Sequence, residues 1–145
     1  MIDFEKEFNE SYGRLLKATT SRENEFFDVF YERFIASSPE VAAKFRDVNM
    51  EHQKTMLKQS LFHMLNLFTQ KTIPDSLTEI AVKHSRRHLD IRPELYHLWL
   101  ECLIETVREM DPQFNDHIEL AWRMVCSQGI ALMTFMYDKQ TPLRP

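Results

Sequence analysis

The chain of 145 residues is acidic overall, with a formal net charge of −4 at pH 7. Its length suits one domain with its own hydrophobic core, and the charge argues against a general nucleic-acid binder. No stretch is apolar enough to span a membrane, and the start lacks the features of a signal peptide, so we expect one cytoplasmic domain over 1–145. Cys102 and Cys126 lie in apolar helical patterns and are expected to be buried thiols.

Apolar residues recur at helical spacing along nearly the whole chain, and only two glycines are present. This pattern predicts an all-α domain of about seven helices. In chain order, the predicted helices are 3–18, 20–36, a short one that begins at 39, 50–69, 76–87, 93–110 and 115–137. Their unequal lengths and short loops favour helices that cross one another over an up-and-down bundle.

Three of these helices begin with a capping signal. Thr20 and Glu23 form a capping box, in which Thr20 would accept a hydrogen bond from the amide of Glu23. Residues 76–79, Ser-Leu-Thr-Glu, have the same pattern. Ser38 is expected to cap the short helix, and Pro39 suits its first turn.

Two polar side chains interrupt apolar helical faces. His84 occupies an apolar position on the face formed by Leu77, Ile80 and Ala81, and Gln53 does so in the helix 50–69. A core histidine bonded to a neighbouring carbonyl explains the first interruption equally well. Two such interruptions on different helices also suggest a shared pocket, and imidazole is a common ligand of transition metals and haem iron.

Several short motifs follow one another in order over residues 26–136. They are Phe30-Tyr31, Pro39-Glu40-Val41 with Phe45, Gln53 with Leu57, Ile80-Ala81-Val82-Lys83-His84, Pro93-Glu94-Leu95-Tyr96 and Ala121-Trp122. Together they resemble the globin family, in particular bacterial single-domain haemoglobins and the globin domain of flavohaemoglobins. The resemblance implies a globin-like fold that encloses haem b, which is iron protoporphyrin IX.

On one side of the haem, the resemblance implies that His84 is the axial ligand of the iron. Its Nε2 would bind the metal and its Nδ1–H would donate to a backbone carbonyl. His88, one turn further on, is the rival ligand, and it could instead contact a haem propionate or remain solvated. Arg86, Arg87 and Arg92 follow closely, and any of them could pair with a propionate.

On the other side, the resemblance places Tyr31 and Gln53 as hydrogen-bond donors to a bound diatomic gas. Phe45 would stack on the porphyrin, and Leu57 would limit the entry of water. A tyrosine with its hydroxyl in water and a glutamine that swings to solvent are the alternatives for the distal pair.

The function implied is reversible binding of dioxygen, nitric oxide or carbon monoxide by a monomer or homodimer, as in oxygen transport. Nitric-oxide dioxygenation is the alternative, and it would need an external reductase because the sequence contains no flavin or nicotinamide domain. A gas sensor that acts through a partner, or a haem-free helical interaction module, would also fit the residues. Cys126 stands where relatives carry a tyrosine, which weakens a peroxidase-like role, and the connection from His84 to Pro93 is about two residues longer than in those relatives.

Overall fold

The computed structural model describes residues 1–17, 25–139 and 143. Within these residues the chain forms seven α-helices and no strand, as the periodicity predicts. The helices are α1 (Phe4–Lys17), α2 (Glu25–Ala36), α3 (Pro39–Lys44), α4 (Met50–Gln70), α5 (Asp75–Lys83), α6 (Glu94–Met110) and α7 (Asp116–Met136). None of them is long and apolar enough to cross a membrane.

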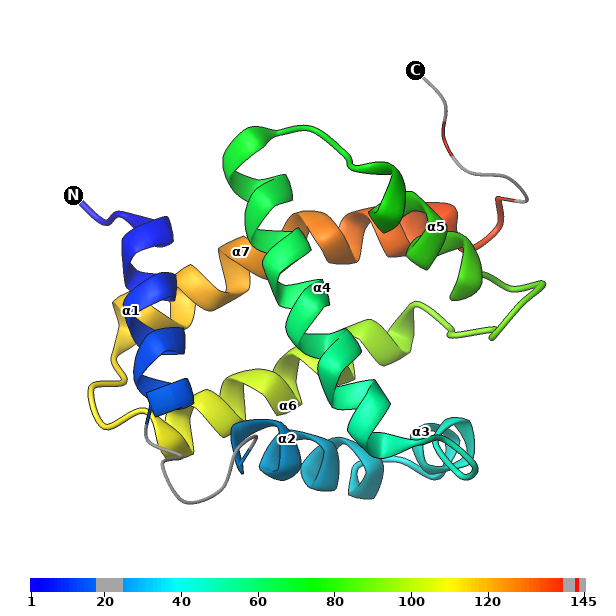
Figure 1. Ribbon diagram of the computed structural model, residues 1–145, viewed down its shortest axis with the longest axis horizontal. Coiled ribbons are helices and arrows are strands. Elements are labelled where there is room, and N and C mark those ends of the chain that lie inside the picture. Colours follow the sequence, from blue (N-terminus) through cyan, green and yellow to red (C-terminus); the bar gives the residue numbers. More distant parts are fainter. Residues whose placement is uncertain (18–24, 140–142, 144–145) are drawn as a thin grey trace.

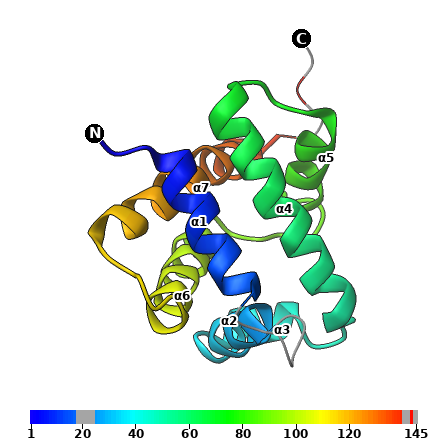
Figure 2. The same cartoon turned by 60° about the vertical axis from the view of Figure 1, so that its left-hand side comes forward.

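In Figure 1, α1 and α4 run across the directions of α2, α6 and α7, so the helices do not form one parallel bundle. Both α1 and α4 pack on α7, α5 covers the carboxyl-terminal half of α7, and α2 packs on α6. The short α3 lies at the same end of the molecule as α2 in both views (Figures 1 and 2). This arrangement brings α2, α3 and the start of α4 together, with α5 at the other end of α4.

Side-chain caps explain where three of the helices begin. The hydroxyl of Ser38 accepts a hydrogen bond from the amide of Glu40 at 3.1 Å, which confirms the predicted cap of α3. Asn49 and Asn115 cap α4 and α7 in the same manner. The capping box predicted at Thr20 lies outside the described residues.

The predicted boundaries of the helix that leads to His84 are wrong at both ends. Helix α5 begins directly after Pro74, whose side chain makes no cap, so Ser76 lies inside the first turn and does not form a capping box. Thr78 instead donates to the carbonyl of Asp75 at 2.8 Å. The helix ends at Lys83, because Ser85 turns back and donates through its amide to the carbonyl of Val82 at 3.0 Å.

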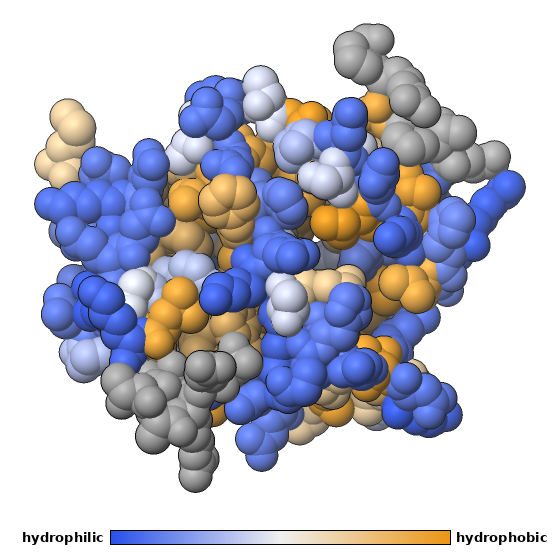
Figure 3. All heavy atoms as spheres, in the orientation of Figure 1, coloured by the Kyte–Doolittle hydropathy of each residue, from blue (hydrophilic) through white to orange (hydrophobic). Residues whose placement is uncertain are grey.

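The buried side chains form two apolar clusters. The larger one surrounds Trp122 and includes Phe30, Tyr31 and Leu57, whereas the smaller one includes Leu77 and Ala81 of α5 with residues of α6 and α7. On the outside, apolar side chains are interspersed with hydrophilic ones over the face shown in Figure 3.

Candidate functional site

His84 lies at the carboxyl-terminal cap of α5, in right-handed helical conformation with φ −84° and ψ −7°. Its Nδ1 is 2.7 Å from the carbonyl oxygen of Ile80. Because a carbonyl can only accept, Nδ1 carries the proton and Nε2 keeps its lone pair. Burial lowers the pKa of His84 below the ordinary 6.5, with Lys83 acting in the same direction and the bond to Ile80 opposing it. At neutral pH the ring is therefore neutral and has one nitrogen available as a ligand.

Tyr31 on α2 and Gln53 in the first turn of α4 come together across 22 positions of sequence. The side-chain amide of Gln53 donates to the hydroxyl of Tyr31, with Nε2 and Oη 3.2 Å apart. Tyr31 is only 4% exposed, and burial raises its pKa to about 12 although the bond from Gln53 opposes this. The hydroxyl therefore stays protonated and can donate, and the alternative of a tyrosine with its hydroxyl in water does not hold.

Phe45 and Leu57 lie beside this pair. Phe45 follows α3, and its ring centroid is 5.6 Å from that of Tyr31 in an edge-on arrangement. Leu57 is one turn beyond Gln53 on α4 and is buried in the same apolar cluster as Tyr31. The structure thus gathers four of the predicted site residues where α2, α3 and α4 meet.

His88 does not share the surroundings of His84. It lies in the turn that follows α5, is exposed, and donates through its amide to the carbonyl of Ser85 at 3.0 Å. Burial and the fixed Nδ1 proton favour His84 over His88 as the metal ligand. A contact of His88 with a propionate stays a prediction.

Two of the three arginines near His84 are engaged in ion pairs. Arg86 pairs with Asp138, with Nε and Oδ1 2.7 Å apart, and Arg92 pairs with Glu40, with Nη2 and Oε1 2.5 Å apart. Within the described part of the chain, Arg87 makes no such pair.

The sequence does not predict a contact between two further residues near His84, Tyr137 and Asp90. The hydroxyl of Tyr137, directly after α7, donates to the carboxylate of Asp90 in the loop after α5. The two residues are 47 positions apart, and a loop residue gives no periodic signal that could have predicted the contact. Cys126 and Cys102 are free buried thiols, as predicted, and burial raises the pKa of Cys126 to about 12.

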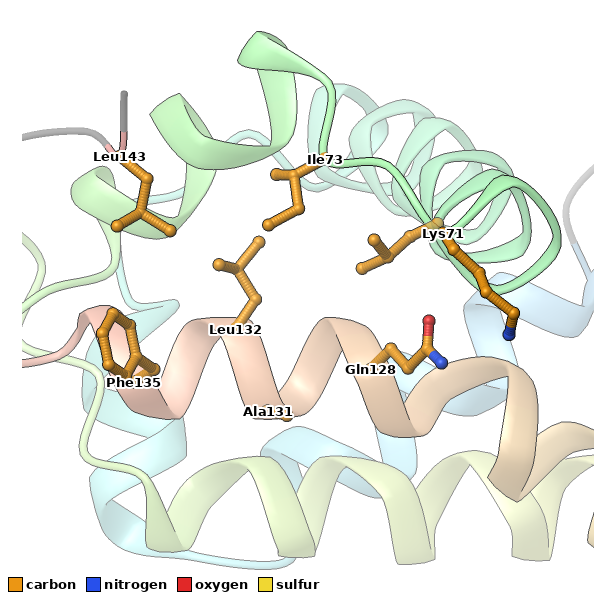
Figure 4. Close-up of a pocket in the computed structure, with 8 residues that line it drawn as sticks. Lys71, Ile73, Gln128, Ala131, Leu132, Phe135 and Leu143 are labelled. Carbon is orange, nitrogen blue, oxygen red and sulfur yellow. The ribbon is translucent and has the colours of Figure 1, made fainter. Parts of the chain in front are cut away.

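An apolar hollow elsewhere on the molecule contains none of these residues (Figure 4). It lies on the outer side of α7, next to the loop after α4, and its lining includes Leu132, Phe135 and Ile73. Lys71 and Gln128 border it. The site built from His84 and Tyr31 is thus separate from this hollow.

No family model matches the sequence. A flavohaemoprotein of Vibrio cholerae serotype O1 (strain ATCC 39315 / El Tor Inaba N16961) is 32% identical over 100 aligned positions, and the match covers 64% of this chain. The match spans 24% of that longer protein. A solved structure from Pseudomonas aeruginosa PAO1, described as structurally highly homologous to a human haemoglobin, is 38% identical. It superposes with a TM-score of 0.82 over 93% of this chain and 98% of its own. The chain belongs to the globin family.

Membership of this family implies a haem cofactor. The residues of this globin fit such a group in two respects. His84 offers a neutral imidazole with Nε2 unprotonated, which is the form that binds iron. In addition, apolar side chains surround both candidate sides of the site: Tyr31 and Leu57 belong to one buried cluster and Ala81 of α5 to the other, and Ile91 and Ile130 pack against both.

Proposed function

We propose that this globin reversibly binds dioxygen, or another diatomic gas, at the iron of haem b. His84 would hold the iron, and Tyr31 and Gln53 would donate hydrogen bonds to the gas. Haem iron supplies the open coordination position for the gas. The observation that carries the proposal is the pair formed by the buried Tyr31 and the half-buried Gln53, whose Oη and Nε2 atoms lie 3.2 Å apart.

Each residue has a separate task in this proposal. The bond from His84 to Ile80 keeps the proton on Nδ1, so that Nε2 remains a ligand and the ring keeps its orientation. The amide of Gln53 has two hydrogens: one is used by Tyr31, and the other is available to a ligand. Leu57 and Phe45 would supply apolar walls that keep water from the gas.

Absorption spectra of the haem-loaded protein test the proposal, with His84→Ala compared with His88→Ala. We expect His84→Ala to collapse or shift the Soret band, because the iron loses its protein ligand, and His88→Ala to leave it in place. The ferrous wild type should bind dioxygen and release it when the gas is removed. An unchanged spectrum in His84→Ala, or failure of the pure protein to take up haem, would contradict the assignment.

Nitric-oxide dioxygenation is the second candidate, and the similarity to a flavohaemoprotein supports it. Nitric oxide and dioxygen together need one electron to become nitrate, so turnover requires a reductase as an external partner. Nitric oxide added to the oxygen-loaded ferrous protein separates the candidates. Stoichiometric nitrate, followed by repeated turnover with a reducing system, favours the enzyme, whereas stable reversible oxygen binding without turnover favours a carrier.

A further inference from the structure

The loop after His84 folds back onto the end of α5. The amide of Asp90 donates to the carbonyl of Ser85 at 2.9 Å, and the amide of Ile91 donates to the carbonyl of His84 at 3.0 Å. Asp90 takes a left-handed conformation with φ 52°, which makes this reversal possible. The backbone of His84 is therefore held from both directions, by Ile80 through its own amide and by Ile91 through its carbonyl.

Four contacts attach this loop to the end of α7. The amide of Arg86 donates to the carbonyl of Tyr137 at 2.9 Å, and the guanidinium of Arg86 lies 4.6 Å from the centre of the Tyr137 ring. Arg86 also pairs with Asp138, but both side chains are more than half exposed, so water weakens that pair. The fourth contact is the hydrogen bond from Tyr137 to the carboxylate of Asp90.

The bond from Tyr137 to Asp90 differs from the exposed ion pairs around it. Tyr137 is only 7% exposed, and its acceptor is charged, which makes the hydrogen bond stronger than a neutral one. The acceptor, Asp90, is also the residue in the left-handed conformation. It directly precedes Ile91, whose amide donates to the carbonyl of His84. On the opposite side, the half-buried side chains of Lys44 and Glu40 reach the loop: Lys44 donates to the carbonyl of Leu89, and Glu40 pairs with Arg92.

We infer that the hydrogen bond from Tyr137 to Asp90 is a clamp that positions His84. It fixes the turn at Asp90, the turn places the amide of Ile91 on the carbonyl of His84, and this bond sets the tilt of the imidazole. Tyr137 and Asp90 are thus positioning residues that act through the backbone of His84. The inference rests on the proposed role of His84 as the iron ligand.

Tyr137→Phe tests the clamp, because it removes only the donating oxygen. In the ferrous, gas-free protein, we expect the iron–histidine stretching band in the resonance Raman spectrum to shift or broaden. In the haem-free chain, the amides of Asp90 and Ile91 should exchange hydrogen about tenfold faster, because the turn opens more often. The hydrogen-exchange measurement does not depend on any cofactor.

Asp90 supplies a second set of variants. Asp90→Gly tolerates the left-handed conformation but removes the acceptor, so it should reproduce the effects of Tyr137→Phe, and the double variant should add little to either. Asp90→Asn keeps a side-chain oxygen and also tolerates that conformation, so it should retain the wild-type band. These variants distinguish a specific bond from a general loss of packing.

Tyr12→Phe is the matched control, since it also deletes one hydroxyl from a tyrosine. The hydroxyl of Tyr12 is buried and has no hydrogen-bond partner among the described residues, so its removal should leave the band and the exchange rates unchanged. If Tyr137→Phe has the same Raman band and the same exchange rates as the wild type, the inferred clamp is wrong. An unchanged spectrum in His84→Ala would overturn the proposed function instead, so the two failures are distinguishable.

Discussion

Two hydrogen bonds join Tyr31 and Gln53: the side-chain amide of Gln53 donates to the hydroxyl of Tyr31 at 3.2 Å, and that hydroxyl donates to the backbone carbonyl of Gln53 at 3.5 Å. Each residue brings a different donor to the site. The pKa of Tyr31 is raised to about 12, so its hydroxyl remains protonated at any physiological pH. Gln53 is half-buried in the first turn of α4. Tyr31 is therefore the more enclosed member of the pair.

Tyr31→Phe and Gln53→Leu should each speed the dissociation of dioxygen by about 2- to 10-fold, which corresponds to the loss of one hydrogen bond. Carbon monoxide carries less negative charge, so its dissociation should change less. Flash photolysis and stopped-flow mixing measure both rates. The effects should not be additive, because each residue is the other's partner. Equal changes for the two gases would point to altered packing.

At the scale of the helix, the sequence predicted most of the architecture and missed the features that depend on distant partners. Gln53 and His84 could be recognised because each interrupts an apolar periodicity, and the cap at Ser38 is a local signal. The boundary of α5 was missed because Pro74 starts the helix earlier than Ser76 would. The bond between Tyr137 and Asp90 joins a helix end to an irregular loop, and neither end has a sequence signature.

The crossing of α4 and α7 gives a prediction at the same scale. A Cβ on Gly129 would lie 2.8 Å from Cγ of Met64, whereas a Cβ on Gly13 of α1 would meet nothing within 4 Å. Gly13→Ala should therefore stabilise the protein by about 0.5–1 kcal/mol through helix propensity. In Gly129→Ala, an overpacking cost of about 1–3 kcal/mol should cancel or exceed that gain. Urea unfolding measures the stability of both variants. If the two variants were stabilised equally, the close approach of Met64 to Gly129 would be contradicted.

At the scale of the whole molecule, one buried polar network ties the first helix to the last two. The carboxylate of Asp111, directly after α6, accepts from the hydroxyl of Ser11 at 2.6 Å and from Nε of Arg14 at 2.8 Å. The indole of Trp122 on α7 donates to Ser11 at 3.0 Å. The side chain of Asp111 is 0% exposed. Burial alone would raise its pKa, but the bonds from Arg14, Ser11 and the amide of Gln113 outweigh it and lower the pKa below 3.8.

Asp111→Ala should lower the free energy of unfolding by about 3 kcal/mol at pH 7, because it leaves Arg14 without its buried partner. The folded-state pKa of Asp111 is depressed, so its contribution is fully present above the unfolded value of about 3.9 and is lost as the pH falls below it. The difference in the free energy of unfolding between the wild type and Asp111→Ala should therefore become smaller below about pH 4. Glu105→Ala, at an exposed ion pair with Arg108, should cost less than about 1 kcal/mol.

The hydrogen bonds around the candidate site also differ in the length of the chain segment between their two partners. The contact of His84 with Ile80 spans 4 positions, that of Tyr31 with Gln53 spans 22, and that of Tyr137 with Asp90 spans 47. Short loops cost less entropy and form sooner during folding. The entropic cost of closure is therefore smallest for the bond from His84 to Ile80 and largest for the bond from Tyr137 to Asp90. The last of these can form only when the end of α7 lies against the loop after α5, so it links the shape of that loop to the docking of α7.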